Sequence, residues 1–170
     1  MTLPVKLCTY ITYRRKVIRR SDILYSILML IGNINFSRYT FQERLKLQKT
    51  VYLLKIFGFD LGYKFNFYIY GPYSVALAQT GSEIRTHPNE QVKPMEFIDP
   101  DLSKNFDLFL KFLGEKKTDP RWLELIASIH YLKTSGVAED RLKSIILSKN
   151  TKFTVEEYET AYTYLRNSNL

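Results

Sequence analysis

The sequence predicts a mainly α fold of the α+β class, a compact helical domain with a small β element around residues 64–70. Three observations support this prediction. Apolar residues recur at helical spacing along most of the 170 residues. Two segments, Thr40–Glu43 and Thr154–Glu157, have the pattern of a helix capping box. One stretch, Tyr63–Tyr70, alternates cleanly like a half-buried strand.

The first helix is expected from Asp22 to about Ile31, with Ser21 as its cap and Gly32 at its end. Basic residues followed by an apolar run also resemble a signal peptide. The run is bounded by a cap and by Gly-Asn, and it is shorter than the roughly 20 residues that span a bilayer. We therefore expect a buried core helix and no membrane partner.

The second helix begins at its capping box, where the Thr40 hydroxyl and the Glu43 carboxylate each satisfy a free backbone N–H. One face carries apolar residues at helical spacing, and Gly58 ends the helix. We expect three lysines to lie on the solvated side of this helix: Lys46, Lys49 and Lys55.

In the alternating stretch, one face is expected to turn inward and to contain Phe65, Phe67 and Ile69. Gly71 would then allow a bend, and Pro72 would start a third helix, because a missing N–H is tolerated in the first helical turn. The turn Tyr70–Ser74 could also hold an anion at that helix start. A structural corner between strand and helix is the interpretation we favour.

The remaining chain is predicted as a second helical half, 102–170, joined to the first half, 21–85, by the proline-rich segment 86–101. Its helices are expected at 102–113, from Asp119-Pro120 to near Gly136, around residues 142–146, and from the second capping box onward. Together the halves would form one domain, 21–170.

Charge is unevenly distributed. The formal net charge is +8, yet residues 1–20 contain six basic and no acidic residues. A basic N-terminal arm of this kind could contact phosphates. The residues of this nucleic-acid alternative are Arg14, Arg15, Lys16, Arg19 and Arg20. A recognition helix at the C-terminus is disfavoured, because its first turn carries Glu156 and Glu157, which would repel phosphate.

No catalytic pattern is evident in the sequence. His87 and His130 have no second histidine or cysteine at ligand spacing, so no metal site and no cofactor are expected. Glycine-rich phosphate loops and the Gly-x-Ser-x-Gly motif are absent. Asp60 with Lys64 could be taken for a nuclease pair, although such pairs are common by chance. The single cysteine, Cys8, excludes an intrachain disulfide and favours a reducing, cytoplasmic setting. We predict a protein that is not an enzyme.

Two motifs together resemble known families. The stretch Arg44–Leu54, "RLKLQKTVYLL", and the turn Tyr70–Ser74, "YGPYS", are similar to the paired motifs of the YwgA-like proteins of bacteria and archaea. The same pair resembles the Panacea or SocA-like domain of antitoxins and phage-associated proteins. Thr50 stands where these families usually have an aliphatic residue. The resemblance implies a mostly helical domain that binds another protein, and it implies no catalytic residues.

The sequence therefore predicts a non-enzymatic intracellular regulatory protein that acts by protein–protein binding, like an antitoxin or an adaptor. Its partner would be a protein, with a toxin as one candidate, and nucleic acid bound by the basic arm is the alternative. The oligomeric state is not predicted. The expected contact surface consists of Lys46, Lys49, Lys64, Tyr68, Tyr70, Tyr73 and Ser74.

Overall fold

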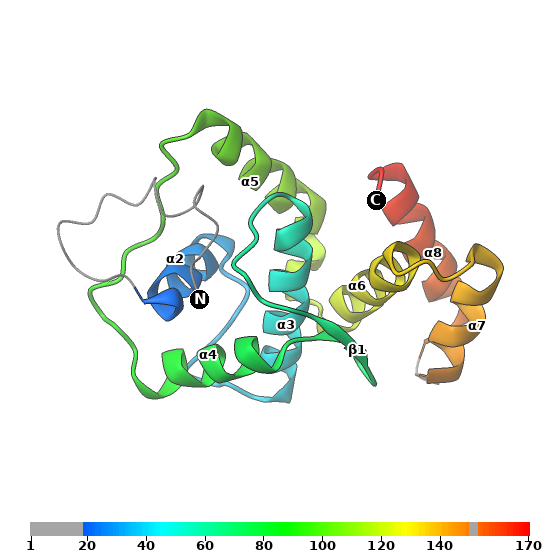
Figure 1. The fold of residues 1–170 in the computed structure, drawn as a ribbon, viewed down its shortest axis with the longest axis horizontal. Coiled ribbons are helices and arrows are strands. Elements are labelled where there is room, and N and C mark those ends of the chain that lie inside the picture. The colour runs from blue at the N-terminus through cyan, green and yellow to red at the C-terminus, as the bar shows by residue number, and fades with distance from the viewer. Residues whose placement is uncertain (1–18, 150–152) are drawn as a thin grey trace.

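Helices make up most of the computed structural model, which describes residues 19–149 and 153–170. Within these residues it contains seven α-helices, one 3-10 helix and one small antiparallel hairpin (Figure 1). The predicted mainly α fold with a small β element is confirmed. The α-helices are α2 (Arg20–Ile31), α3 (Phe41–Ile56), α4 (Val75–Thr86), α5 (Pro100–Leu113), α6 (Pro120–Thr134), α7 (Glu139–Lys149) and α8 (Val155–Asn167). The remaining elements are β1 (Asn66–Tyr68), β2 (Gly71–Tyr73) and η1 (Gly114–Thr118).

Helix α3 lies in the middle of the fold, in contact with α4, α6 and β2 (Figure 1). Every residue from Leu45 to Leu54 is buried. The expectation that Lys46 and Lys49 face solvent is wrong, because neighbouring elements cover both sides of the helix. Each buried ammonium has a partner instead: Lys46 pairs with Glu43 at 2.9 Å, and Lys49 donates to the Pro72 carbonyl at 2.7 Å.

Several predicted helix ends are confirmed, including the starts at Thr40 and Thr154, but the start at Ser21 is not. The capping box of α8 is complete, with Thr154 and Glu157 bonded in both directions. The α3 box is only half formed: the Thr40 hydroxyl accepts from the Glu43 N–H at 3.4 Å, whereas the Glu43 carboxylate accepts from the Asn35 N–H. Ser21 is not the cap of α2. It lies inside the helix, and its hydroxyl donates to Glu83.

The region 64–74 is a hairpin rather than a strand that runs into a helix. Strands β1 and β2 are antiparallel, with Phe67 opposite Pro72. Pro72 therefore does not start α4; a proline is tolerated here because both strands of a two-stranded sheet are edges. Helix α4 begins later, with the Ser74 hydroxyl accepting from the Leu77 N–H. Ile69 was expected to be inside but is 70% exposed, since it lies in the turn.

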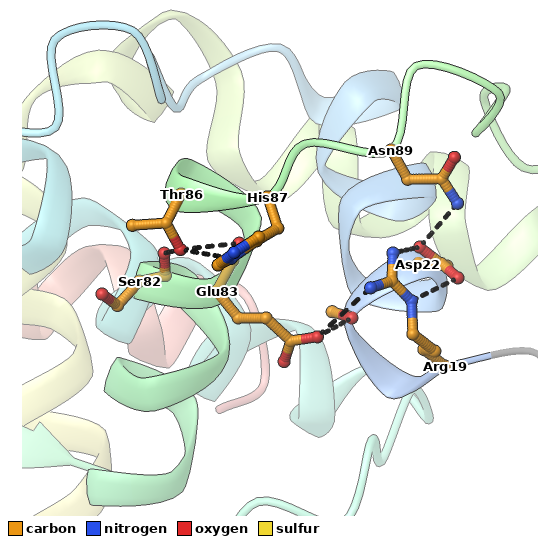
Figure 2. Close-up of polar contacts among 8 residues, drawn as sticks. Arg19, Asp22, Ser82, Glu83, Thr86, His87 and Asn89 are labelled. Carbon is orange, nitrogen blue, oxygen red and sulfur yellow. Dashed lines mark hydrogen bonds and ion pairs between the residues drawn. The ribbon is translucent and has the colours of Figure 1, made fainter.

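The proline-rich connection between α4 and α5 is held against α2. The Ser26 hydroxyl donates to the Lys93 carbonyl at 2.6 Å, and the Asn89 amide donates to Asp22 at 3.1 Å. Figure 2 shows Asn89 and Arg19 converging on the same Asp22 carboxylate. Farther along, Phe97 packs against Phe59 and Phe106 in the core. The connection thus closes one side of the molecule.

Candidate functional site

The two sequence motifs that carry the resemblance are in direct contact. The Gln48 side-chain amide donates to the Ser74 carbonyl at 3.0 Å and accepts from the Ser74 N–H at 2.8 Å. Lys49 adds its bond to the Pro72 carbonyl. Because the side chains of Gln48 and Lys49 are buried, these bonds are shielded from water. The motifs on α3 and on the hairpin therefore form one structural unit.

A glutamine suits this position because its amide offers one donor group and one acceptor, as a peptide unit does. Gln48 thereby binds the backbone at Ser74 as a neighbouring strand would. This pairing fixes the end of β2 just before α4 begins. The second strand is consequently held by side chains of α3 as well as by β1.

Lys49 is enclosed between α3, the hairpin and α6. A Cβ added to Gly71 would lie 3.6 Å from the Lys49 Nζ and 2.0 Å from the Ser128 Oγ. Burial lowers the pKa of the Lys49 ammonium to about 7, and the negative charge of Glu124 on α6 offsets part of this effect. Gly71, with a φ of +80°, is the residue that allows this close approach.

A half-open pocket of about 330 Å³ lies at the base of the hairpin, and we call it the hairpin pocket. Its aromatic side chains come from two parts of the chain, the start of α3 and the hairpin. Tyr70 packs edge-on against Phe41, with ring centroids 5.1 Å apart. The pocket is lined by Tyr39, Phe41, Arg44, Leu45, Gln48, Lys49, Tyr68, Ile69, Tyr70, Gly71, Tyr73 and Ala78.

The structure brings together part of the predicted contact surface. Tyr68, Tyr70 and Tyr73 all line the hairpin pocket, as does the buried Lys49. Lys64 is exposed but does not line it. Two predicted residues are displaced from this surface: Lys46 borders another cavity, beside Asn33, and Ser74 is buried at the start of α4.

Two residues of the basic arm make internal contacts. Arg19 pairs with Asp22 at 2.9 Å and lies 3.6 Å from Glu83 (Figure 2). Arg20 donates to the Leu61 carbonyl, and its guanidinium lies 3.7 Å from the centre of the Tyr63 ring. These contacts engage both side chains within the fold. The other three residues of the nucleic-acid alternative, Arg14, Arg15 and Lys16, lie outside the described residues.

Sequence reasoning missed Phe41, Arg44 and Ile69 as parts of this surface. In the sequence, Phe41 is visible only as part of a capping box, and the alternation predicts Ile69 on the inner face of a longer strand. The signal that could have located Ile69 is Gly71, since a glycine directly after a two-residue turn is typical of a tight hairpin with a left-handed residue.

We also searched residues 19–149 and 153–170 for a metal site and for membrane-spanning helices. These residues contain no group of three or more His, Cys, Asp or Glu side chains placed to hold a metal ion. The helices described there are too short or too polar to cross a membrane. His130 is buried, and its Nδ1 is hydrogen-bonded to the Tyr52 hydroxyl at 2.9 Å. This histidine joins α6 to α3.

The structure thus defines a mainly helical protein with an aromatic pocket beside a hairpin that α3 holds in place by hydrogen bonds. The chain is similar to the uncharacterized protein YwgA of Bacillus subtilis (strain 168). The two are 26% identical over 153 residues, which cover 72% of this chain and 84% of YwgA. This similarity supports a relationship to YwgA-like proteins. No family model matches the chain, and no solved structure matches it.

Proposed function

We propose that this protein acts by binding a partner protein through the hairpin pocket and its rim. The observation that carries the proposal is the concentration of exposed apolar side chains there. Among the described residues, nine large hydrophobic side chains are exposed, and four of them, Phe41, Tyr68, Ile69 and Tyr70, line this pocket. Clustered exposed apolar residues of this kind mark interaction surfaces, and tyrosine is favoured in them.

The hydrogen bonds that fix the hairpin to α3 support the same proposal. Gln48 and Lys49 hold β2 and the adjoining Ser74 by three buried hydrogen bonds, so the hairpin is positioned before a partner arrives. Preorganisation lowers the entropy lost on binding. In Figure 1 the hairpin projects past the start of α4 at the edge of the molecule, where a partner has access to it.

The proposed role is regulatory, in the manner of an antitoxin or an adaptor. The support for it is the pair of motifs that resembles YwgA-like and Panacea or SocA-like proteins, since both motifs contribute residues to the hairpin pocket. A toxin is accordingly one candidate for the partner. Lys64, exposed beside β1, would contribute a cation at the border of the contact.

Site-specific photo-crosslinking in the native host tests the proposal. A photoreactive residue at position 69 is expected to capture a defined protein. The matched control is position 98, because Ile69 and Ile98 are 70% and 65% exposed and only Ile69 lines the pocket. Capture that is equal at both positions, or co-purification of nucleic acid with no captured protein, would contradict the proposal.

A further inference from the structure

The hairpin pocket combines apolar walls with one accessible positive charge, that of Arg44. Its lining includes Arg44 and Lys49 and no Asp or Glu. The nearest acidic neighbour in sequence, Glu43, is already engaged by Lys46 and by the Asn35 N–H. An occupant with a negative charge would therefore meet no acidic side chain in the wall.

Arg44 is the cation that remains accessible at this pocket. It is exposed and makes no ion pair with any of the described residues. Among those residues its side chain makes one long hydrogen bond, 3.5 Å to the Tyr39 carbonyl, and its guanidinium lies 6.0 Å from the Phe41 ring centre. Lys49, by contrast, is buried and donates a hydrogen bond to the Pro72 carbonyl. Arg44 thus leaves a fork of donors suited to a carboxylate.

From this arrangement we propose that the occupant is a segment of a partner protein in which a large apolar side chain lies close to a carboxylate. The apolar side chain enters the hairpin pocket, and the carboxylate pairs with Arg44. The inference rests on the proposed protein-binding function and specifies the chemistry of the partner. The volume of about 330 Å³ fits one large side chain with its adjoining backbone.

A peptide segment agrees with the walls better than a nucleic acid does. Ile69, Leu45 and Ala78 are aliphatic, whereas binding of single strands relies on flat stacking platforms and several phosphate contacts. The Tyr70 and Phe41 rings meet edge-on, at 68° between their planes, and so offer no continuous platform. One accessible arginine satisfies one carboxylate but gives little counterion release along a phosphate backbone.

Selection of a random peptide library on the full-length protein tests this inference. We expect the enriched peptides to share a large apolar residue with an Asp or Glu close by. A synthetic consensus peptide should then bind roughly tenfold more weakly to Arg44→Glu than to wild type. Replacing the acid of the peptide by lysine should restore binding to Arg44→Glu, because the charges are then exchanged.

Two controls separate local from general effects. Arg141→Glu reverses an exposed arginine on α7, outside the pocket, and should leave peptide binding unchanged. Ile69→Asp should abolish binding, and Ile98→Asp should not. All variants must keep the helical circular dichroism of the wild type before their binding is compared.

The outcomes distinguish this inference from the proposed function. Three results would each overturn the inference that the occupant is a segment with an apolar side chain close to a carboxylate. These are enriched peptides without an acid, an unchanged affinity for Arg44→Glu, and failure to enrich any peptide. Arg44-dependent binding of an RNA oligonucleotide in place of peptide would overturn it as well. None of these results would contradict the crosslinking of a protein at position 69. The proposed protein-binding function would be contradicted by the crosslinking experiment and not by these peptide experiments.

Discussion

Gly71 lies directly against Ser128 of α6. We expect Gly71→Ala to destabilise the protein by roughly 2–4 kcal/mol, because two penalties combine. Its φ of +80° disfavours any side chain, and the new Cβ would lie 2.0 Å from the Ser128 Oγ. Urea unfolding followed by circular dichroism measures the loss. The added change Ser128→Ala should recover part of it by removing that oxygen.

Gly136 provides the control for backbone strain alone. Its φ is +82°, and a Cβ there would meet nothing within 4 Å. Gly136→Ala is therefore expected to cost only about 1 kcal/mol. Equal losses at Gly71 and Gly136, with no recovery by Ser128→Ala, would show that the hairpin is not packed against α6 in this way.

Lys49 gives the stability a predictable dependence on pH. Its pKa is lowered from 10.5 to about 7 by burial, so between these values the unfolded chain holds a proton that the folded chain lacks. Stability contributed by this site therefore rises as the pH increases through that interval. Relative to Lys49→Met, which has no such titration, the wild type should gain at least about 1 kcal/mol over the interval, because one pKa unit corresponds to about 1.4 kcal/mol.

The measurement is the free energy of unfolding in urea for both proteins at each end of that pH interval. Lys55→Met is the matched control, since Lys55 is on the same helix, is about half exposed and pairs with Asp60. A pH-dependent difference that appears for Lys49→Met and not for Lys55→Met assigns the effect to the buried ammonium. If the difference for Lys49→Met did not change with pH, the Lys49 ammonium would not be shielded from water as described.

At the scale of elements, helices α6 and α8 are joined by an ion pair with two short contacts. Arg121 donates to both carboxylate oxygens of Glu157, at 2.6 and 2.8 Å. The hydrogen bond from Arg121, helped by the Thr154 N–H, lowers the pKa of Glu157 to about 2. Both side chains are about 40% exposed, so solvent screens the pair. Glu157→Gln should therefore cost no more than about 1 kcal/mol at neutral pH.

The stabilisation from Glu157 decreases in acid. The pKa of Glu157 is lowered from 4.5, so its stabilisation is complete above that pH and is lost as the pH falls toward 2. The wild type and Glu157→Gln should thus converge in acid when their urea midpoints are compared. Glu159→Gln, which breaks the exposed pair with Lys143, should have a smaller effect at neutral pH. A constant offset for Glu157→Gln at all pH values would contradict the assignment.

The elements also show which features a sequence can reveal. Asp119-Pro120 and the box Thr154–Glu157 act within one helical turn, so their helix starts were predictable. The burial of Lys49 was not, because it depends on elements that pack around α3 from elsewhere in the chain. Pro72 is locally compatible with both a helix start and an edge strand, and contacts with α3 decide between them. The hairpin pocket forms only when residues 66–73 make a hairpin, so the sequence did not reveal Ile69 and Phe41 as part of its lining.

At the scale of the whole molecule, the predicted halves 21–85 and 102–170 share one core. Helix α3 of the first half packs against α6 of the second, and the Tyr52 hydroxyl is bonded to His130 across this contact. Both side chains are buried, so Tyr52→Phe leaves a histidine nitrogen without a partner. We expect this change to cost roughly 1–3 kcal/mol. If the halves unfold together, the change in the first half must also shift a probe that reports only on the second half.

Trp122, the single tryptophan, provides that probe, because it lies on α6. In urea, its fluorescence and the far-ultraviolet circular dichroism should change at the same midpoint in wild type. Both should move to lower urea by the same amount in Tyr52→Phe. Tyr162→Phe, on the half-buried side of α8, should move neither. A Trp122 transition that stays in place while the helical signal shifts would mean that the halves unfold separately, and that the α3–α6 contact joins two cores and does not make one.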